Sequence, residues 1–273
     1  TPKPSSAASD VYKRQELHMN INSDISASEQ TKIQNLVNRR LHHEPLAYIL
    51  GYREFFGNLF TVNESVLIPR PETECLVEAI IDYLRYKSIK SPIILDVGCG
   101  SGIIGGSILQ NVPNINLFSI DISPSAAKIA NENLHKITKS DNFNVLICDL
   151  IEGVKLPVDL IAANLPYIPT KRIPKLQKEI VLHEPKIALD GGIEGIETIC
   201  RLINQSTRIL KPDGAIFLDV DTDPINPVYL GEWDEQYIHD GMVRGDTMWA
   251  GCIYSGKLYA VDVLSLIHIS EPT

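Results

Sequence analysis

The segment Asn164-Leu-Pro-Tyr167 combines groups that could hold a planar amino group. Asn164 offers a side-chain carbonyl oxygen, and Pro166 stiffens the turn so that a backbone carbonyl is presented at a fixed angle. Tyr167 adds a flat apolar face on which the planar group could stack. Two acceptors for the two N–H bonds would leave one face of the nitrogen open to an incoming methyl group. We expect Asn164, Leu165, Pro166 and Tyr167 to be the catalytic residues.

Methylation of an amide nitrogen would need no general base in this arrangement. An amide nitrogen is a poor nucleophile, because its lone pair is delocalised. Catalysis would therefore come from orientation and from acceptors that strengthen as positive charge grows on the nitrogen. The alternative interpretation is a turn in which proline and asparagine serve the backbone alone.

A second segment, Asp96-Val-Gly-Cys-Gly-Ser-Gly102, is typical of a loop that approaches a ligand closely, because glycine turns tightly and has no Cβ in the way. Gly100-Ser-Gly-Ile-Ile-Gly105 also satisfies the dinucleotide pattern G-x-G-x-x-G, and Asp121 follows at the distance expected for an acid on the ribose. The loop alone therefore fits both NAD and S-adenosylmethionine. The acid Asp96 before the first glycine, and the lack of Lys or Arg in the loop, favour a cationic sulfonium over two phosphates.

Acidic residues at two predicted strand ends complete the expected cofactor site. Asp121 could accept hydrogen bonds from both ribose hydroxyls, or it could cap the helix that follows it. Asp149 could meet the adenine amino group while Leu150 covers the ring, or Asp149 could lie in a surface loop. The expected cofactor-binding residues are Gly98, Cys99, Gly100, Ser101, Gly102, Asp121, Asp149, Leu150 and Asn164.

Short apolar runs alternate with helical stretches from residue 93 onward. Strands are predicted at 93–97, 115–120, 143–148, 158–163 and 215–220, and helices at 103–111, 124–137 and 195–210. Because parallel neighbours need crossover connections, the alternation predicts a doubly wound α/β fold with a mostly parallel sheet covered on both faces. Ligands bind outside the carboxyl ends of such strands, which places the site in the loops after residues 97, 120, 148 and 163.

The preceding residues predict two helices and a hairpin. Ser26-Ala-Ser-Glu29 has the form of a capping box, and apolar residues recur after it at helical spacing up to Pro45. Residues 53–62 are aromatic and β-branched around Gly57-Asn58, which suggests a short hairpin. A helix that opens at Pro71 would turn five apolar side chains inward, namely Leu76, Val77, Ile80, Ile81 and Leu84.

Both ends of the chain resemble the two strands of a translated sequencing adaptor, in residues 5–15 and 264–273. We therefore expect a non-native tail at 1–15 and another at 264–273. Between them we expect a partial N-terminal helical domain at 16–52, a β-hairpin linker at 53–70 and an S-adenosylmethionine-dependent methyltransferase domain at 71–263.

Composition narrows the class of protein. The 273 residues are 44% hydrophobic and 22% charged, which excludes a disordered or collagen-like chain. A net charge of −9 disfavours bulk nucleic-acid binding, since proteins that grip a duplex normally carry a basic surface. Five cysteines without a Cys-x-x-Cys pair predict neither a disulfide framework nor a metal site. Without a membrane-length apolar run or an export signal, a cytoplasmic location is expected, and we expect a monomer.

These motifs resemble one enzyme family. Asp-x-Gly-x-Gly-x-Gly followed by Asn-x-Pro-Tyr is similar to the amino-group methyltransferases. The segments 44–51, 67–74 and 183–192 are similar to the HemK/PrmC family, the protein-glutamine methyltransferases of peptide-chain release factors, and Arg-Pro-Glu-Thr-Glu74 is the most discriminating part. The resemblance implies a Rossmann-like class I methyltransferase with a small helical N-terminal domain that docks the release factor. The implied reaction is S-adenosylmethionine-dependent methylation of the glutamine in the factor's Gly-Gly-Gln motif.

The resemblance also carries over site residues by position. Gly98 to Gly102 and Asp121 would hold the cofactor, Leu150 would flank adenine, and Asn164 to Tyr167 would hold the substrate amide. The chain departs from the family at Leu165, where proline is usual, and at Leu150, where a bulky aromatic is common. By comparison with the family we expect a shortened N-terminal domain, and the sequence beyond residue 221 does not resemble the family's closing helix and strands.

Four other functions share part of this pattern. The same tetrapeptide grips adenine or cytosine amino groups in nucleic-acid methyltransferases, but a basic groove would then be expected. Glutamine in another translation protein is a further substrate to consider. An NAD-dependent oxidoreductase would need a proton donor near the nicotinamide, and no such constellation is evident. A cofactor-binding relic without catalysis is the last alternative.

Overall fold

A computed structural model describes residues 25–138, 141–219, 240–244, 247–252 and 257–262. The two expected non-native tails and the first residues of the expected N-terminal domain lie outside the described residues. In 240–262 only the backbone of three strands is described.

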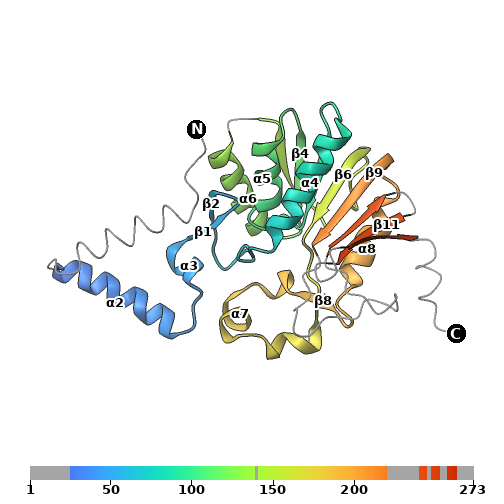
Figure 1. The fold of residues 1–273 in the computed structure, drawn as a ribbon. Helices are drawn as coiled ribbons and strands as arrows, with labels where there is room; N and C mark the ends of the chain where they lie inside the picture. The colour runs from blue at the N-terminus through green and yellow to red at the C-terminus, as the bar shows by residue number, and fades with distance from the viewer. Residues whose placement is uncertain (1–24, 139–140, 220–239, 245–246, 253–256, 263–273) are drawn as a thin grey trace.

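An eight-stranded sheet forms the centre of the molecule, in the order β12-β11-β10-β9-β6-β3-β4-β5 (Figure 1). Its parallel part consists of β3 (Ile93–Val97), β4 (Asn116–Asp121), β5 (Phe143–Ile147), β6 (Val158–Ala163) and β9 (Leu210–Asp219). An antiparallel meander, β10 (Asp240–Arg244), β11 (Thr247–Cys252) and β12 (Lys257–Asp262), continues the sheet beyond β9. The predicted mostly parallel α/β sheet is confirmed.

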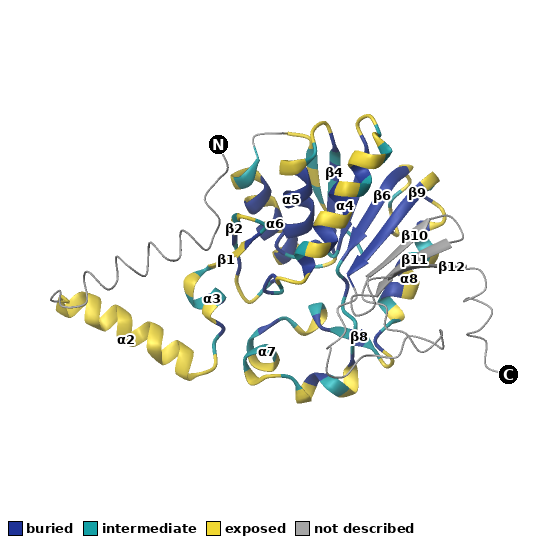
Figure 2. Cartoon of the chain, viewed as in Figure 1, coloured by how far each residue is buried: buried dark blue, intermediate teal, exposed yellow. Residues whose placement is uncertain are grey.

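Helices cover both faces of the parallel strands. One face packs against α4 (Thr73–Lys87), α5 (Ile103–Asn111) and α6 (Pro124–Ile137), and the other against α8 (Glu197–Ser206). Neighbouring strand residues therefore enter opposite cores: Ile94 packs with the first group of helices and Leu95 with α8. Because both faces of the central strands are covered, β3 and β6 read as continuous apolar runs in the sequence, and β6 is buried in Figure 2. The edge strand β5 is partly exposed.

The predicted hairpin is formed by β1 (Tyr52–Phe55) and β2 (Asn58–Thr61). Its turn is at Phe56 and Gly57, both with positive φ (48° and 72°), as the twist of a two-residue hairpin requires. Phe55 and Phe60 are 1% and 0% exposed, so the hairpin belongs to the core that α4 and α5 share. A hydrogen bond from the Phe56 backbone N–H to Glu74 Oε1 (2.9 Å) ties the turn to α4.

The helix predicted after Ser26 is α2 (Ala27–Leu41), and its capping box is present: Ser26 Oγ accepts from the Glu29 N–H, and Glu29 accepts from the Ser26 N–H. Its apolar side chains are not covered by the described residues; Ile33, Leu36, Val37 and Leu41 are 42–70% exposed (Figure 2). A short helix, α3 (Leu46–Leu50), leads from α2 into the hairpin.

The chain makes a long excursion between β6 and α8 that the sequence did not predict. It contains β7 (Ile168–Pro169), the 3-10 turn Thr170–Lys175, α7 (Lys178–His183), a second 3-10 turn at Lys186–Ala188, and β8 (Asp190–Gly192), which pairs with β7. In the described part of the chain, no helix is long and apolar enough to cross a bilayer.

Candidate functional site

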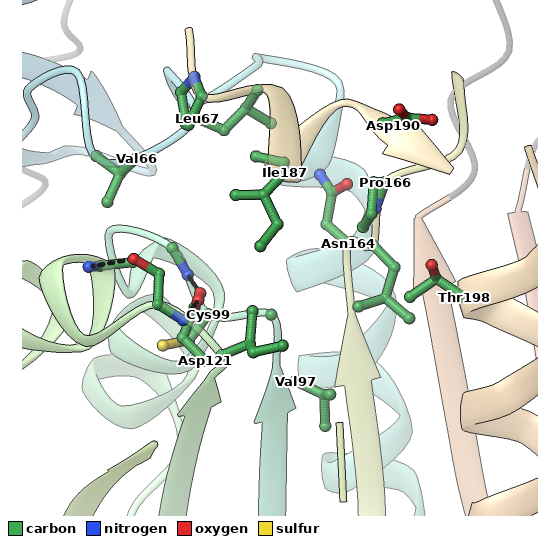
Figure 3. A pocket seen from close by; sticks show the side chains of 18 of the residues that line it. Val66, Leu67, Val97, Cys99, Asp121, Asn164, Pro166, Ile187, Asp190 and Thr198 are labelled. Carbon is green, nitrogen blue, oxygen red and sulfur yellow. Dashed lines mark hydrogen bonds between the residues drawn. The ribbon is translucent and has the colours of Figure 1, made fainter. Parts of the chain in front are cut away.

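A cavity of about 700 Å³ opens at the carboxyl ends of β3, β4 and β6 (Figure 3). Its floor comes from the loops after these strands and after β5, where sequence patterns placed the site. Opposite the floor lies what we call the outer wall, formed by residues 65–70 and 185–192. Val66, Leu67 and Ile187 of this wall face Cys99 and Asp121 across the cavity in Figure 3.

The glycine loop makes the floor because its backbone takes left-handed conformations. Gly98, Gly100 and Gly102 have φ of 71°, 53° and 78°, values that strain residues with a side chain. A Cβ on Gly98 would lie 3.0 Å from Leu165 Cδ2, whereas a Cβ on Gly100 would meet no atom closer than 4.0 Å. Gly100 therefore leaves open space beside the cavity, whereas Gly102 is the N-cap of α5 and does not line the cavity.

Asp96 lies beneath the glycine loop and does not line the cavity. It is fully buried; its Oδ2 accepts from the Gly105 N–H at 2.9 Å, and its Oδ1 has no partner among the described residues. Burial raises the pKa of Asp96 from 3.8 to about 7. The expectation that Asp96 gives the cofactor an acidic surround was therefore wrong, because its carboxyl supports the start of α5 from the core.

Asp121 does line the cavity, as do the carboxylates of Asp149, Asp190 and Glu197. Its Oδ2 accepts from the Gly100 N–H (2.8 Å) and its Oδ1 from the Ser123 N–H (2.9 Å), as Figure 3 shows. Burial raises its pKa, while these backbone bonds act in the opposite direction. The N-cap of α6 is Ser123, whose hydroxyl accepts from the Ala126 N–H, so Asp121 is not needed as the cap. Each carboxylate oxygen keeps a lone pair for a hydroxyl ligand.

Asp149 and Leu150 also line the cavity. Asp149 Oδ2 accepts a charge-assisted hydrogen bond from Arg201 Nη2 of α8 at 2.7 Å. Leu150 is buried and has a positive φ of 48°, an uncommon conformation for a leucine. Their predicted contacts with adenine remain predictions.

Asn164 is held by two elements that are distant in sequence. Its Nδ2 donates to Thr73 Oγ1 (3.1 Å), at the start of α4, and to Asp219 Oδ2 (2.9 Å), at the end of β9. Within the part of the chain that the structure describes, its Oδ1 accepts no hydrogen bond. Asn164 lines the cavity, so it can offer this oxygen to a ligand.

The rest of the tetrapeptide divides between cavity and core. Leu165 and Pro166 line the cavity, and Leu165 is 4% exposed. Tyr167 is not among the described residues that line it; the ring packs on the core between the sheet and α8. The turn is pressed against β8, because a Cβ on Gly191 would lie 2.7 Å from both the Pro166 oxygen and the Tyr167 Cα. Stacking of Tyr167 on the substrate remains a prediction.

The outer wall is the part of the site that was missed, and a buried carboxylate joins its two segments. Glu184, whose side chain is 1% exposed, accepts from Arg70 Nη2 at 2.6 Å and from the Ile68 N–H at 3.2 Å. On the other side, the Tyr48 hydroxyl of α3 donates to the Val66 carbonyl at 2.6 Å. The segments 67–74 and 183–192 were singled out by resemblance alone; their polar pairing has no signal in a single sequence.

Two protein-family models match this chain. A family model described as the methyltransferase small domain matches residues 73–193, and one described as the PrmC N-terminal domain matches residues 11–51. The release factor glutamine methyltransferase of Clostridium acetobutylicum is 34% identical over 225 residues, which cover 80% of this chain and 78% of that protein. The chain belongs to the release factor glutamine methyltransferase family.

The share of each relative's length that this chain covers differs from one relative to the next. The release factor glutamine methyltransferase of Bradyrhizobium diazoefficiens is 36% identical over 196 residues, 71% of this chain and 66% of the relative. Among solved structures, the hMettl16 catalytic domain with the MAT2A 3′UTR hairpin 6 has a TM-score of 0.49 at 15% identity, covering 62% of this chain and 63% of that one. So distant a likeness adds no argument about function.

The cavity of this release factor glutamine methyltransferase family member fits S-adenosylmethionine. Asp121 offers acceptors to ribose hydroxyls, and Gly100 leaves room for a ligand against the backbone. Family membership and this fit together assign S-adenosylmethionine as the cofactor.

Proposed function

We propose that this protein transfers a methyl group from S-adenosylmethionine to the side-chain amide nitrogen of the glutamine in the Gly-Gly-Gln motif of a peptide-chain release factor. The names of the relatives support this substrate, and the cavity supports the chemistry. The observation that carries the proposal is the Asn164 side chain, which lines the cavity with its amide nitrogen bound internally and its carbonyl oxygen unused by the described residues.

An acceptor in this position suits a nitrogen that must be methylated. The cofactor supplies an electrophilic methyl carbon on a positively charged sulfur. Asn164 Oδ1 would accept one N–H of the substrate amide and a backbone carbonyl of the same turn would accept the other. As the nitrogen forms its bond to the methyl carbon and the carbon–sulfur bond breaks, the nitrogen becomes positive and both acceptors bind more strongly. The methylated nitrogen then loses one proton to solvent.

Position matters as much as polarity in this scheme. Pro166 and the contact with Gly191 fix the backbone of the turn, and Leu165 packs against Gly98 of the floor. The amide would thus be held between the turn and the glycine loop, close to where the cofactor binds. Orientation of this kind can supply several kcal/mol of a barrier, on the order of 7–11 kcal/mol in well-oriented intramolecular reactions.

The release factor itself would dock beside the cavity, and we propose that residues 16–52 contribute to that surface. The exposed apolar side chains of α2 are consistent with it. Ion pairing of Arg40 with Glu179 and a hydrogen bond between the His183 ring and the His42 carbonyl (3.1 Å) join the end of α2 to α7, next to the outer wall.

Labelled cofactor tests the proposal directly. The protein is incubated with labelled S-adenosylmethionine and a purified release factor, and in parallel with the same factor carrying Gly-Gly-Glu. We expect label on the first factor alone. Equal labelling of both factors would overturn the glutamine assignment. A parallel titration with NAD provides a second check, because binding of NAD more tightly than S-adenosylmethionine would contradict a methyltransferase.

A further inference from the structure

Two buried residues that do not line the cavity, Thr73 and Asp219, bind the amide of Asn164, which does. Thr73 is the first residue of α4 and Asp219 the last of β9, and they are 1% and 5% exposed. Thr73 Oγ1 donates to Asp219 Oδ2 at 2.6 Å, and Asn164 Nδ2 donates to both of them. Thr73 belongs to the Arg-Pro-Glu-Thr-Glu74 segment, for which the proposed reaction has so far given no role.

The hydrogen bonds among Thr73, Asp219 and Asn164 have fixed donors and acceptors. The Thr73 hydroxyl donates its single proton to Asp219 Oδ2, so it can only accept from Asn164. Both N–H bonds of Asn164 are then directed inward. A flipped amide would set its oxygen against the Asp219 carboxylate with no proton between them, which is unfavourable in a buried site.

We infer that Thr73 and Asp219 are positioning residues that force Asn164 to present an acceptor to the substrate, so that the site selects an NH2 group over an oxygen at the same place. The inference rests on the proposed function, in which that NH2 group is the glutamine amide. A glutamate oxygen in its place would face the Asn164 oxygen, acceptor against acceptor. A site whose buried polar groups are fixed in this way discriminates strongly against a substrate that would leave them unpaired.

The test compares variants of the full chain. Thr73→Val removes the hydroxyl at similar volume, Thr73→Ser keeps it, and Asp219→Asn replaces the carboxylate with an amide that can itself flip. Ser107→Ala is the matched control, because the Ser107 hydroxyl is buried on α5, lies outside the cavity and has no partner among the described residues.

Two measurements are made on each variant. The first is kcat for methylation of the release factor together with the affinity for S-adenosylhomocysteine. We expect Thr73→Val to lower kcat by about 10- to 100-fold, as small misplacements of a reacting group do, while affinity for S-adenosylhomocysteine is unchanged. Thr73→Ser should restore most of the loss, and Ser107→Ala should behave as wild type.

The second measurement is the ratio of affinities for the Gly-Gly-Gln and Gly-Gly-Glu forms of the release factor, each with S-adenosylhomocysteine present. Wild type should prefer the glutamine form by about tenfold or more, because the wrong form leaves buried acceptors facing each other. Thr73→Val and Asp219→Asn should lose most of this preference. Residues that only support the fold would weaken both forms equally and leave the ratio unchanged.

A wild-type ratio in both Thr73→Val and Asp219→Asn would overturn the inference, as would a loss of S-adenosylhomocysteine binding in proportion to the loss of kcat. If Thr73→Val fails to fold, the ratio in Asp219→Asn decides alone. A wild-type protein that prefers the glutamine form but methylates neither form would refute the proposed function and still support the orientation of Asn164.

Discussion

Replacing Asp121 with alanine should weaken cofactor binding and loosen the glycine loop together. In the structure, each carboxylate oxygen of Asp121 accepts one backbone N–H, from Gly100 and from Ser123, at 2.8 and 2.9 Å. Asp121→Ala removes both acceptors and the proposed partner of the ribose hydroxyls. The same side chain therefore shapes the floor of the cavity and binds the ligand there.

The structure sets the size of each effect. An orphaned donor costs about 1–3 kcal/mol, and because the cavity admits water we expect the lower end, about 1 kcal/mol for each of the two N–H groups. The free energy of unfolding should thus fall by about 2 kcal/mol. Lost hydrogen bonds between the carboxylate and the ribose should weaken cofactor binding by a further 1–3 kcal/mol, or about 5- to 150-fold in Kd.

Calorimetric titration with S-adenosylmethionine and denaturant unfolding of the same preparations measure the two effects separately. Ser26→Ala is the matched control: it removes the N-cap hydroxyl of α2 at a cost of about 1 kcal/mol in stability, and Ser26 does not line the cavity, so Kd should not change. The reasoning fails if Asp121→Ala binds the cofactor as wild type does, or if Ser26→Ala weakens binding to the same extent.

Three further predictions concern the turn and the core. Asn164→Ala should lower kcat by about 10²–10³-fold, as loss of one group that stabilises developing charge does, with S-adenosylmethionine affinity unchanged in calorimetry; a parallel loss of affinity would mean that Asn164 holds the cofactor instead. Because the folded pKa of Asp96 is about 7 against an ordinary 3.8, the native state binds the extra proton, so this residue makes stability fall as pH rises from about 4 to 7. Denaturant unfolding of Asp96→Asn across that range should show a smaller fall than wild type, and an equal fall would refute the assignment. Gly191→Ala should lower both activity and Tm, because its Cβ would lie 2.5 Å from the Gly195 oxygen and 2.7 Å from the Pro166 oxygen, whereas Gly153→Ala, with nothing closer than 3.9 Å, should be neutral in the same assays.

The sheet and the floor of the site could be predicted because local patterns encode them. Strand 93–97 was predicted at its observed bounds, and the glycine loop follows it directly, since apolar runs and glycines at a strand end have consistent structural meaning. The observed start of a helix differs from the predicted one where a turn precedes the helix. The helix predicted from Pro71 is α4, which begins at Thr73 because residues 71 and 72 form a turn. The hairpin turn lies one residue earlier than Gly57-Asn58 suggested.

The outer wall and the support of Asn164 could not be predicted in the same way. Thr73 and Asp219 meet Asn164 from 91 and 55 residues away, and such contacts leave no periodic signal in the sequence. Asp96 was misjudged for a related reason: the pattern shows an acid beside the glycines, but only the fold shows whether its carboxyl faces the ligand or the core. Whether an acidic side chain at a strand end is buried or lines the cavity can therefore be read only from the structure.

The hydrogen bonds of Glu184 make the two segments of the outer wall behave as one piece. Glu184 itself does not line the cavity, so the position of the outer wall over the glycine loop depends on a group that no ligand in the cavity would touch. We therefore expect the rate at which the spent cofactor leaves to depend on this buried carboxylate. A single substitution at this carboxylate would change how long products stay while the groups that touch them are left as they are.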